Sequence, residues 1–209
     1  MKNVLLVGAP NSGKSALFNR LTGLKHKVAN YPGITIDVGS GALRSDTRAQ
    51  VWDFPGTYSL NAISGEEEVA IDALRSALAD ERPAVVAMVL DATRLEKGLT
   101  YCLQVAREAA RSKKPYLVLL NMMDILERNE LALDLDGLRA SLGVPVLPVS
   151  ARTGNGVEAA EAALLSASAA QSPWADTPDA LIEGSAQQIA DRFVPQGELL
   201  VRRQAKIDN

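Results

Sequence analysis

The chain is short of the residues that build disulfides and histidine metal sites. Its 209 residues include one cysteine, Cys102, and one histidine, His26. One cysteine cannot form an intrachain disulfide, and one histidine excludes a histidine-rich metal centre. We therefore expect Cys102 to be a small buried hydrophobe and His26, which lies between two lysines, to be a solvated loop side chain.

Long apolar runs are also missing. The longest, Ala84–Leu90, falls well below the ~20 residues that a membrane-spanning helix needs. The apolar start at Val4 is too short for a signal peptide. A net charge of −3 argues against a nucleic-acid-binding surface as the main purpose of the chain. Its 47% of hydrophobic residues is enough for one core of ordinary size.

Apolar runs rich in β-branched residues alternate with helical patterns along most of the chain. The expected strands are Val4–Val7, Ile34–Leu43, Thr47–Trp52, Ala84–Leu90, Tyr116–Leu120 and Val144–Leu147. The expected helices are Lys14–Leu21, Glu66–Ala79, Lys97–Ser112, Asp136–Leu142 and Gly156–Ala169. This alternation predicts an α/β fold with a mostly parallel six-stranded sheet and helices on both faces. The short connection Arg44–Asp46 predicts one antiparallel edge strand.

The composition changes near residues 171–174. Pro173 and Pro178, with small polar residues around them, mark a boundary. We expect residues 1–170 to form the main domain and residues 171–209 a short helical appendage. Within it, Ala180–Arg192 and Glu198–Ile207 are the candidate helices. So short a segment either docks on the main domain or connects to something that the chain lacks.

A phosphate-binding loop is the strongest motif. Residues 8–15 read GAPNSGKS and fit the pattern G-x-x-x-x-G-K-[ST], between an apolar strand and a helix-like stretch. Backbone N–H groups of such a loop surround a phosphate, the lysine reaches the outer phosphates, and the hydroxyl holds Mg²⁺. A chance glycine-rich turn is the alternative, which the strand and helix context disfavours. The expected binding residues are Gly8, Asn11, Ser12, Gly13, Lys14, Ser15 and Ala16.

Two further segments are candidates for the Mg²⁺ and γ-phosphate end of the site. Asp53 ends a predicted strand, where a carboxylate can hold Mg²⁺ through water, and Gly56 can offer its N–H to a γ-phosphate. The segment Asn30–Thr35 contains Gly33 and could supply the Thr35 hydroxyl to Mg²⁺ and the Thr35 N–H to the γ-phosphate. A plain turn at Asp53–Gly56 and a solvated loop threonine at Thr35 stay open from spacing alone.

The last two segments suit a guanine base. Asp124, in Asn121–Asp124, can accept the N1 and N2 hydrogens of guanine, while Asn121 braces the surrounding loops and Met122 lies between them. Backbone N–H groups of Ser150, Ala151 and Arg152 can face the guanine O6 atom. A helix N-cap at Asp124 is the equal alternative when the tetrapeptide is taken alone. All five segments follow strands in the order expected for one nucleotide crevice.

The ordered set resembles the five motifs of translation-factor-type GTPases, a Ras-like P-loop fold, from Asn3 to about Ala169. In detail, Gly8–Gly23, Asn30–Thr35, Asp53–Leu60, Asp91–Glu96 and Asn121–Asp124 resemble the cytosolic N-terminal G domain of the bacterial ferrous iron transport protein B family (FeoB). Most GTPases carry a lysine at the position of Met122, and this family commonly has an apolar residue there.

The resemblance implies a slow GTPase on the cytoplasmic face of the bacterial inner membrane that supports Fe²⁺ uptake, with this fragment itself soluble. It implies GTP or GDP and Mg²⁺ as ligands, with Ser15, Thr35 and Asp53 toward the metal. Catalysis would rest on Lys14, Thr35, Asn11 and Gly56, and Asn11 resembles the K⁺-coordinating asparagine of cation-activated GTPases. Thr57 stands where Ras-type enzymes have a water-orienting glutamine.

The implied partners are guanine nucleotide, the transmembrane part of the full-length protein and, left open, a small accessory protein. No nucleic acid is expected, and the oligomeric state stays open. Two other functions also stay open. One is a soluble GTPase acting on ribosomes or tRNA, which usually carries a basic appendage. The other is a non-catalytic GTP/GDP sensor, whose output is the ordering of its loops.

Overall fold

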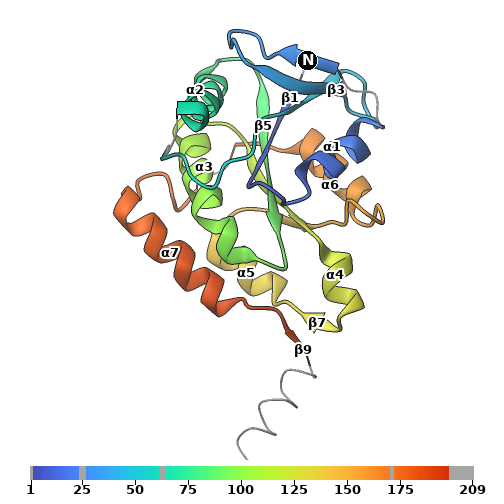
Figure 1. The fold of residues 1–209 in the computed structure, drawn as a ribbon, viewed down its shortest axis with the longest axis vertical. Helices are drawn as coiled ribbons and strands as arrows, with labels where there is room; N and C mark the ends of the chain where they lie inside the picture. Colours follow the sequence, from blue (N-terminus) through green and yellow to red (C-terminus); the bar gives the residue numbers. More distant parts are fainter. Residues whose placement is uncertain (1, 24–26, 62–64, 170–171, 198–209) are drawn as a thin grey trace, which may run out of the picture.

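The computed structural model describes residues 2–23, 27–61, 65–169 and 172–197. The strands are β1 (Lys2–Gly8), β2 (Lys27–Asn30), β3 (Asp37–Ala42), β4 (Ala49–Asp53), β5 (Ala84–Asp91), β6 (Tyr116–Asn121), β7 (Leu131–Ala132), β8 (Val146–Pro148) and β9 (Gln196–Gly197). The helices are α1 (Lys14–Thr22), α2 (Gly65–Ala79), the short 3-10 helix η1 (Leu95–Lys97), α3 (Leu99–Arg111), α4 (Met123–Arg128), α5 (Leu135–Leu142), α6 (Val157–Ser166) and α7 (Asp179–Arg192). Figure 1 shows their arrangement.

One sheet crosses the molecule in the order β2-β3-β4-β1-β5-β6-β8. The neighbours from β4 to β8 pair in parallel, whereas β3 runs antiparallel to both β4 and β2. The α/β fold and its mostly parallel sheet are therefore confirmed. The sheet has seven strands rather than the six expected, because β2 adds an edge strand beyond β3. Its four residues are mostly exposed and lack an apolar pattern that would have predicted a strand.

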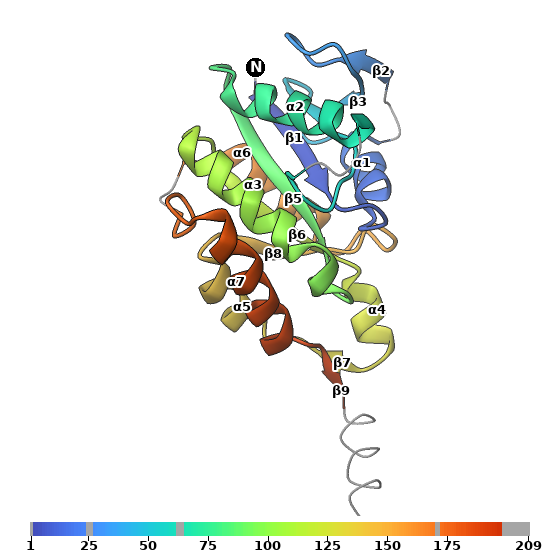
Figure 2. The ribbon, with the colours of Figure 1, turned by 60° about the vertical axis from the view of Figure 1, so that its left-hand side comes forward.

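The pleat of the central strands divides the core into two layers. In β1, Leu5 and Val7 belong to one buried cluster, while Val4 and Leu6 belong to the other. Such alternation follows from the period of two in a strand. Helices α1 and α6 cover the face of Val4 and Leu6, and α2, α3, α5 and α7 contribute to the opposite cluster. Figure 2 shows α2, α3 and α7 in front of the sheet and α6 behind it.

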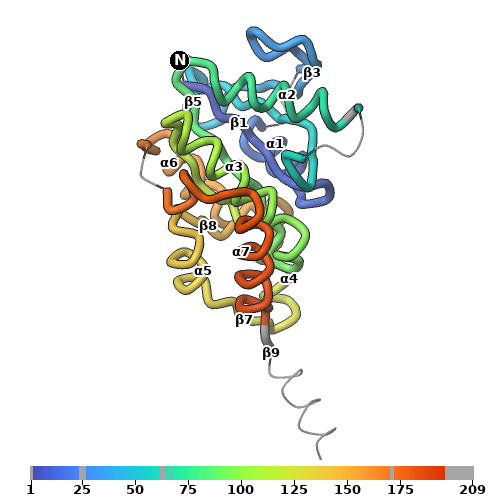
Figure 3. The backbone as a smooth tube through the Cα atoms, turned by 90° about the vertical axis from the view of Figure 1, so that its left-hand side faces the viewer, coloured from blue at the N-terminus to red at the C-terminus, as the bar shows by residue number. Residues whose placement is uncertain are grey.

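The helix expected over Ala180–Arg192 forms as α7 and packs along α3 (Figure 3). Its buried residues Ile182, Ala186 and Ile189 join the core cluster of the main domain. Ahead of α7, Trp174 Nε1 donates a hydrogen bond of 2.7 Å to Leu142 O. After it, β9 pairs antiparallel with β7. The predicted helix Glu198–Ile207 lies outside the described residues.

Two remaining expectations concern single residues. Cys102 is fully buried on α3, as expected, and burial raises the pKa of its thiol to about 12. The predicted loop position of His26 lies outside the described residues. Within the described ranges we find no helix with the length and apolar character that crossing a lipid bilayer requires.

Candidate functional site

The segment between β1 and α1 curls into a tight loop. Asn11 has a φ of 64° and Gly13 a φ of 81°, both in the left-handed region. A Cβ added at Gly13 would lie 2.2 Å from Asn121 Nδ2, so only glycine fits there. The loop therefore leads directly into the amino end of α1, where backbone N–H groups and the helix dipole favour the binding of an anion.

A pocket of about 360 Å³ opens over this loop. It is lined by Ala9, Pro10, Asn11, Gly13, Lys14, Ser15, Ala16 and Gly56. Gly56 comes from the segment after β4, and a Cβ there would lie 3.2 Å from both Gly8 O and Pro10 N. The structure thus brings Gly56 against the phosphate-binding loop, as the sequence predicts. The absence of a side chain at Gly56 allows that approach.

The predicted lysine and aspartate of the site contact each other. Lys14 Nζ donates a hydrogen bond to Asp53 Oδ1, and the two side chains are 10% and 16% exposed. Asp53 ends β4 beside β1, because the two strands pair in parallel with Leu6 opposite Asp53. An ammonium group therefore balances the carboxylate charge at the position where a Mg²⁺ ligand is expected.

Ser12 and Gly8 line the inner side of the loop. A Cβ at Gly8 would meet Val89 O at 2.7 Å and Ser12 Oγ at 3.0 Å. Ser12 is buried, and its hydroxyl has no hydrogen-bond partner among the described residues. A buried unpaired hydroxyl in a native protein calls for a partner. Ser12 is not among the residues that line the pocket over the loop, so this hydroxyl faces the protein interior.

The opposite end of the site is built around the carboxylate of Asp124. Ser150 Oγ donates to Asp124 Oδ1 at 2.7 Å, and Arg152 Nε donates to Asp124 Oδ2 at 2.7 Å. The Ser150 hydroxyl, with the Arg152 guanidinium as a smaller contribution, lowers the pKa of the Asp124 carboxyl. Asp124 is therefore held as a charged acceptor. The stability that it contributes is present above its unfolded pKa and is lost as pH falls through the lower folded pKa.

Asn121 joins three predicted segments. Its Nδ2 donates to Ser12 O at 3.0 Å, and its Oδ1 accepts the Ala151 N–H at 2.9 Å. Asn121 is 1% exposed. The side-chain amide of Asn121 thus links the phosphate-binding loop to residues 150–152, which is the bracing contact expected from the sequence. Met122, with a φ of 68°, places its Cε 3.0 Å from the Cβ position of Gly13 and so packs on the same loop.

Replacing Asn121 tests this link. Asn121→Ala is expected to lower the free energy of unfolding by about 2–4 kcal/mol, since it leaves two buried backbone groups without partners. Urea unfolding followed by circular dichroism measures the change. Asn129→Ala is the control, because Asn129 is exposed and bonds only within its own helix turn. Equal stability of the two variants would contradict the bracing role.

Two predicted residues, Gly33 and Thr35, do not line the pocket. Both lie in the loop between β2 and β3 and are exposed, and no described contact joins Thr35 to the phosphate-binding loop. The loop is anchored by Tyr31, which is fully buried and packs edge-on against Trp52 with ring centroids 5.1 Å apart.

Arg82 contacts Tyr31 and the neighbouring Pro32. Its guanidinium lies 5.0 Å from the centre of the Tyr31 ring and donates a hydrogen bond to Pro32 O. Neither Arg82 nor Tyr31 is predicted from the sequence as part of the site. A tyrosine in a segment rich in turn formers was the available signal for the anchor.

Known proteins with similar sequences match most of this chain, including the residues described above. A family model described as ferrous iron transport protein B matches residues 2–164. An Fe(2+) transporter FeoB of Leptospira biflexa is 40% identical over 157 residues, which cover 75% of this chain and 22% of that protein. The Fe(2+) transporter FeoB of Escherichia coli K12 is 38% identical over 164 residues, covering 76% of this chain and 20% of the relative. This chain therefore spans about a fifth of the length of these relatives.

Solved structures agree with the sequence relatives. A GDP-bound mutant of the S. thermophilus FeoB G-domain superposes with a TM-score of 0.68 at 33% identity, over 81% of this chain and 62% of that one. NFeoB from S. thermophilus bound to GDP.AlF4- and K+ gives a TM-score of 0.67 at 34% identity, over 81% of this chain and 63% of the other. The fold is thus that of a FeoB G domain, and the chain belongs to the ferrous iron transport protein B family.

Proposed function

We propose that this chain binds GTP and hydrolyses it slowly, as the cytosolic G domain of a membrane transporter for Fe²⁺. The observation that carries the proposal is the pocket that gathers Asn11, Lys14, Ser15 and Gly56 over one curled loop. The family relation supports it, since structural neighbours bind GDP and GDP.AlF4-. Iron transport would belong to the full-length protein, of which the curated relatives are examples.

At the phosphate end, binding would redistribute the charges already present. Lys14 would leave Asp53 and reach the outer phosphates, together with the N–H groups of residues 12–16. Asp53 would then be free to hold Mg²⁺ through water, with the hydroxyls of Ser15 and Thr35 as direct ligands. Bound Mg²⁺ would neutralise charge that develops on the phosphate oxygens.

At the base end, Asp124 would accept the N1 and N2 hydrogens of guanine. The N–H groups of Ser150, Ala151 and Arg152 would face the guanine O6, while Asn121 holds this loop against the phosphate-binding loop. Adenine lacks the donors that Asp124 requires in this arrangement. The Arg152 guanidinium, which contacts Asp124 Oδ2, would share the carboxylate with the base.

The loop that carries Thr35 would have to close over the γ-phosphate. Order and disorder of such a segment with the nucleotide state is a known device of GTPases. In the structure described here Thr35 is exposed, and Gly33, with a φ of 84°, gives the loop a left-handed turn. Closure would convert nucleotide state into a change of shape that supports iron uptake.

The proposed function also assigns a domain organisation to the chain. Residues 1–170 would be the G domain, and residues 171–209 a short helical spacer toward a transmembrane region, with α7 docked on α3. The chain would then sit at the cytoplasmic face of the bacterial inner membrane. Its partners would be guanine nucleotide and the transmembrane part, with a small accessory protein left open.

A monovalent cation would supply charge that this site otherwise lacks. Asn11 lines the pocket, is exposed and has a left-handed backbone, and its side-chain oxygen would be the ligand for the cation. A neighbouring G domain is described as bound to K+. We expect GTP hydrolysis in KCl to exceed that in NaCl by about tenfold at equal ionic strength, which corresponds to about 1.4 kcal/mol of transition-state stabilisation by K⁺. Phosphate release in the two salts measures this.

Asn11→Gly is the matched variant, since it removes the side-chain ligand and glycine tolerates the left-handed backbone at this position. We expect its rate to be low and equal in both salts. Wild-type rates that do not differ between the salts would contradict the role of Asn11.

A non-catalytic sensor is the second candidate, and one observation favours it. Thr57 follows Gly56, is 5% exposed, and donates its hydroxyl to Ser59 O at 3.0 Å. It is therefore occupied within its own loop and does not orient an attacking water. Phosphate release at saturating GTP separates the two candidates, because a sensor binds GTP without turnover.

A further inference from the structure

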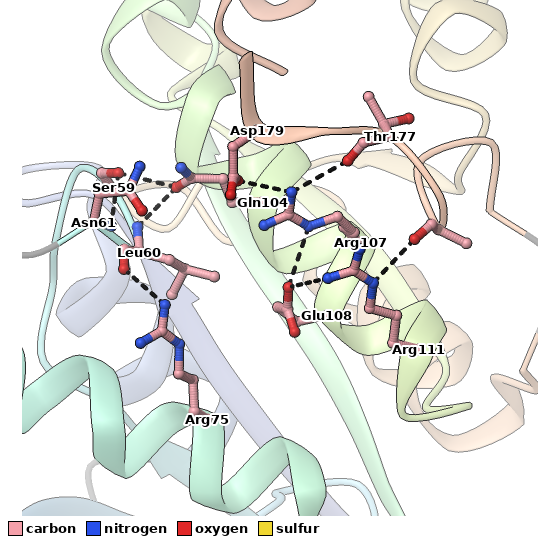
Figure 4. Close-up of polar contacts among 11 residues, drawn as sticks. Ser59, Leu60, Asn61, Arg75, Gln104, Arg107, Glu108, Arg111, Thr177 and Asp179 are labelled. Carbon is pink, nitrogen blue, oxygen red and sulfur yellow. Dashed lines mark hydrogen bonds and ion pairs between the residues drawn. The ribbon is translucent and has the colours of Figure 1, made fainter. Parts of the chain in front are cut away.

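The segment that follows Gly56 is held by helix α3 through one buried glutamine. Gln104 is 1% exposed, although it lies within an otherwise apolar stretch of α3. Its Oε1 accepts the Leu60 N–H at 2.7 Å and the Ser59 hydroxyl at 3.1 Å, and Figure 4 shows both contacts. A buried amide with two donors on one oxygen fixes the position of those donors.

The same segment has a second attachment, to helix α2. Residues 57–60 form neither helix nor strand, so no regular backbone pairing holds them. Thr57 Oγ1 bonds to Ser59 O, and the Leu60 carbonyl accepts Arg75 Nη2 of α2 at 3.1 Å. Gly56 is thus separated by only a few residues from a point where α2 and α3 both hold the chain.

Helix α3 is also fixed further along its length, toward its carboxyl end. Arg107 Nη1 pairs with Asp179 Oδ1 at 2.7 Å and donates to Thr177 O at 3.2 Å, while Arg111 Nε donates to Ala175 O at 3.1 Å (Figure 4). These bonds connect α3 to the segment that leads into α7. Gln104 therefore projects from a helix that is anchored independently of the loop that it holds.

We propose that Gln104 is a positioning residue for GTP hydrolysis, which acts by fixing residues 57–60 so that the Gly56 N–H faces the γ-phosphate. This rests on the proposed function. A misplacement of about 1 Å in such a donor can cost about 100-fold in rate. GDP carries no γ-phosphate, so GDP binding does not use this donor. The effect is confined to steps that involve the γ-phosphate or its transition-state analogue.

The test compares Gln104→Met, Ser59→Ala and Gln104→Glu with the wild-type chain. Gln104→Met keeps the size of the side chain and removes the acceptor, so we expect kcat to fall about tenfold and GDP affinity to stay within about twofold. Ser59→Ala removes the longer of the two bonds to Gln104 Oε1, together with the bond from the Asn61 N–H to Ser59 Oγ, and is expected to lower kcat by about threefold. Gln104→Glu keeps an oxygen acceptor in either protonation state and is expected to restore kcat to within about threefold of wild type.

Arg107→Met is the matched control for general loosening of α3. It removes the bonds to Thr177, Asp179 and Glu108 and leaves the Gln104 contacts intact, so we expect kcat within about twofold of wild type. Thermal melting and fluorescent GDP binding are measured for every variant. Binding of GDP with aluminium fluoride gives a second readout, which Gln104→Met should weaken by the same factor as kcat.

The outcomes separate the two proposals. Turnover by the wild-type chain with an unchanged kcat in Gln104→Met overturns the role of Gln104 alone. An equal loss of kcat and GDP affinity, or the same loss in Arg107→Met, also overturns it, since Gln104 would then act only through the fold. No turnover and no aluminium fluoride complex in the wild-type chain would overturn the proposed function, and this inference with it.

Discussion

Lys14→Ala is expected to weaken GTP binding by on the order of 100-fold, because it removes the charge-assisted hydrogen bonds from Lys14 to the outer phosphates. In the structure Lys14 contacts Asp53, so the ammonium already lies beside the carboxylate that is proposed to face Mg²⁺. The variant leaves Asp53 without its partner, but the carboxylate keeps some access to water. Titration with a fluorescent GTP analogue in Mg²⁺ measures the loss.

Lys27→Ala is the control for this prediction. Lys27 lies exposed on the edge strand β2, and its removal is expected to change GTP affinity by less than about twofold. Unfolding curves of both variants separate a loss of binding from a loss of fold. A Lys14→Ala chain that melts normally and still binds GTP within a few-fold of wild type would contradict the assignment of the loop.

Asp124→Asn is expected to change the base preference from guanine to xanthine. Its side-chain N–H can donate to the C2 carbonyl of xanthine, whereas it cannot accept the N2 hydrogens of guanine. One lost acceptor in a buried polar site costs about 1–3 kcal/mol, so we expect GDP affinity to fall by about 10–100-fold and xanthosine diphosphate affinity to rise. Competition against a fluorescent nucleotide by the two diphosphates gives the ratio.

The matched control is Asp136→Asn, which removes an exposed carboxylate paired only with Arg139 in its own helix. It should leave the preference for guanine unchanged. If Asp124→Asn keeps a strong preference for GDP, then the base does not lie against Asp124, and the interpretation of Asn121–Asp124 as the guanine segment is wrong.

The phosphate-binding loop could be predicted because its chemistry is local. Backbone curvature, the lysine and the helix start all lie within residues 8–16, and parallel strands bring their carboxyl ends to one edge. The contact of Asp53 with Lys14 follows from that rule, since β4 pairs beside β1. The carboxylate of Asp124 and the Ser150 hydroxyl meet for the same reason at the ends of β6 and β8.

The remaining features depend on contacts that no local pattern reveals. The position of Thr35 depends on where Tyr31 packs, and that contact joins the loop to Trp52 across the sheet. Gln104 accepts hydrogen bonds from Ser59 and Leu60, which lie more than 40 residues earlier in the chain. A polar residue in an apolar helix face signals a buried partner but does not say which one. The pair β7 and β9 is equally non-local.

The most direct test of the account is steady-state phosphate release by this chain with GTP and with ATP, in KCl with Mg²⁺. We predict slow turnover of GTP and no detectable turnover of ATP, since in the proposed function the loop binds the phosphates and Asp124 selects the base. Equal turnover of both nucleotides, or no nucleotide binding at all, would contradict the central claim that this chain is a guanine-specific GTPase.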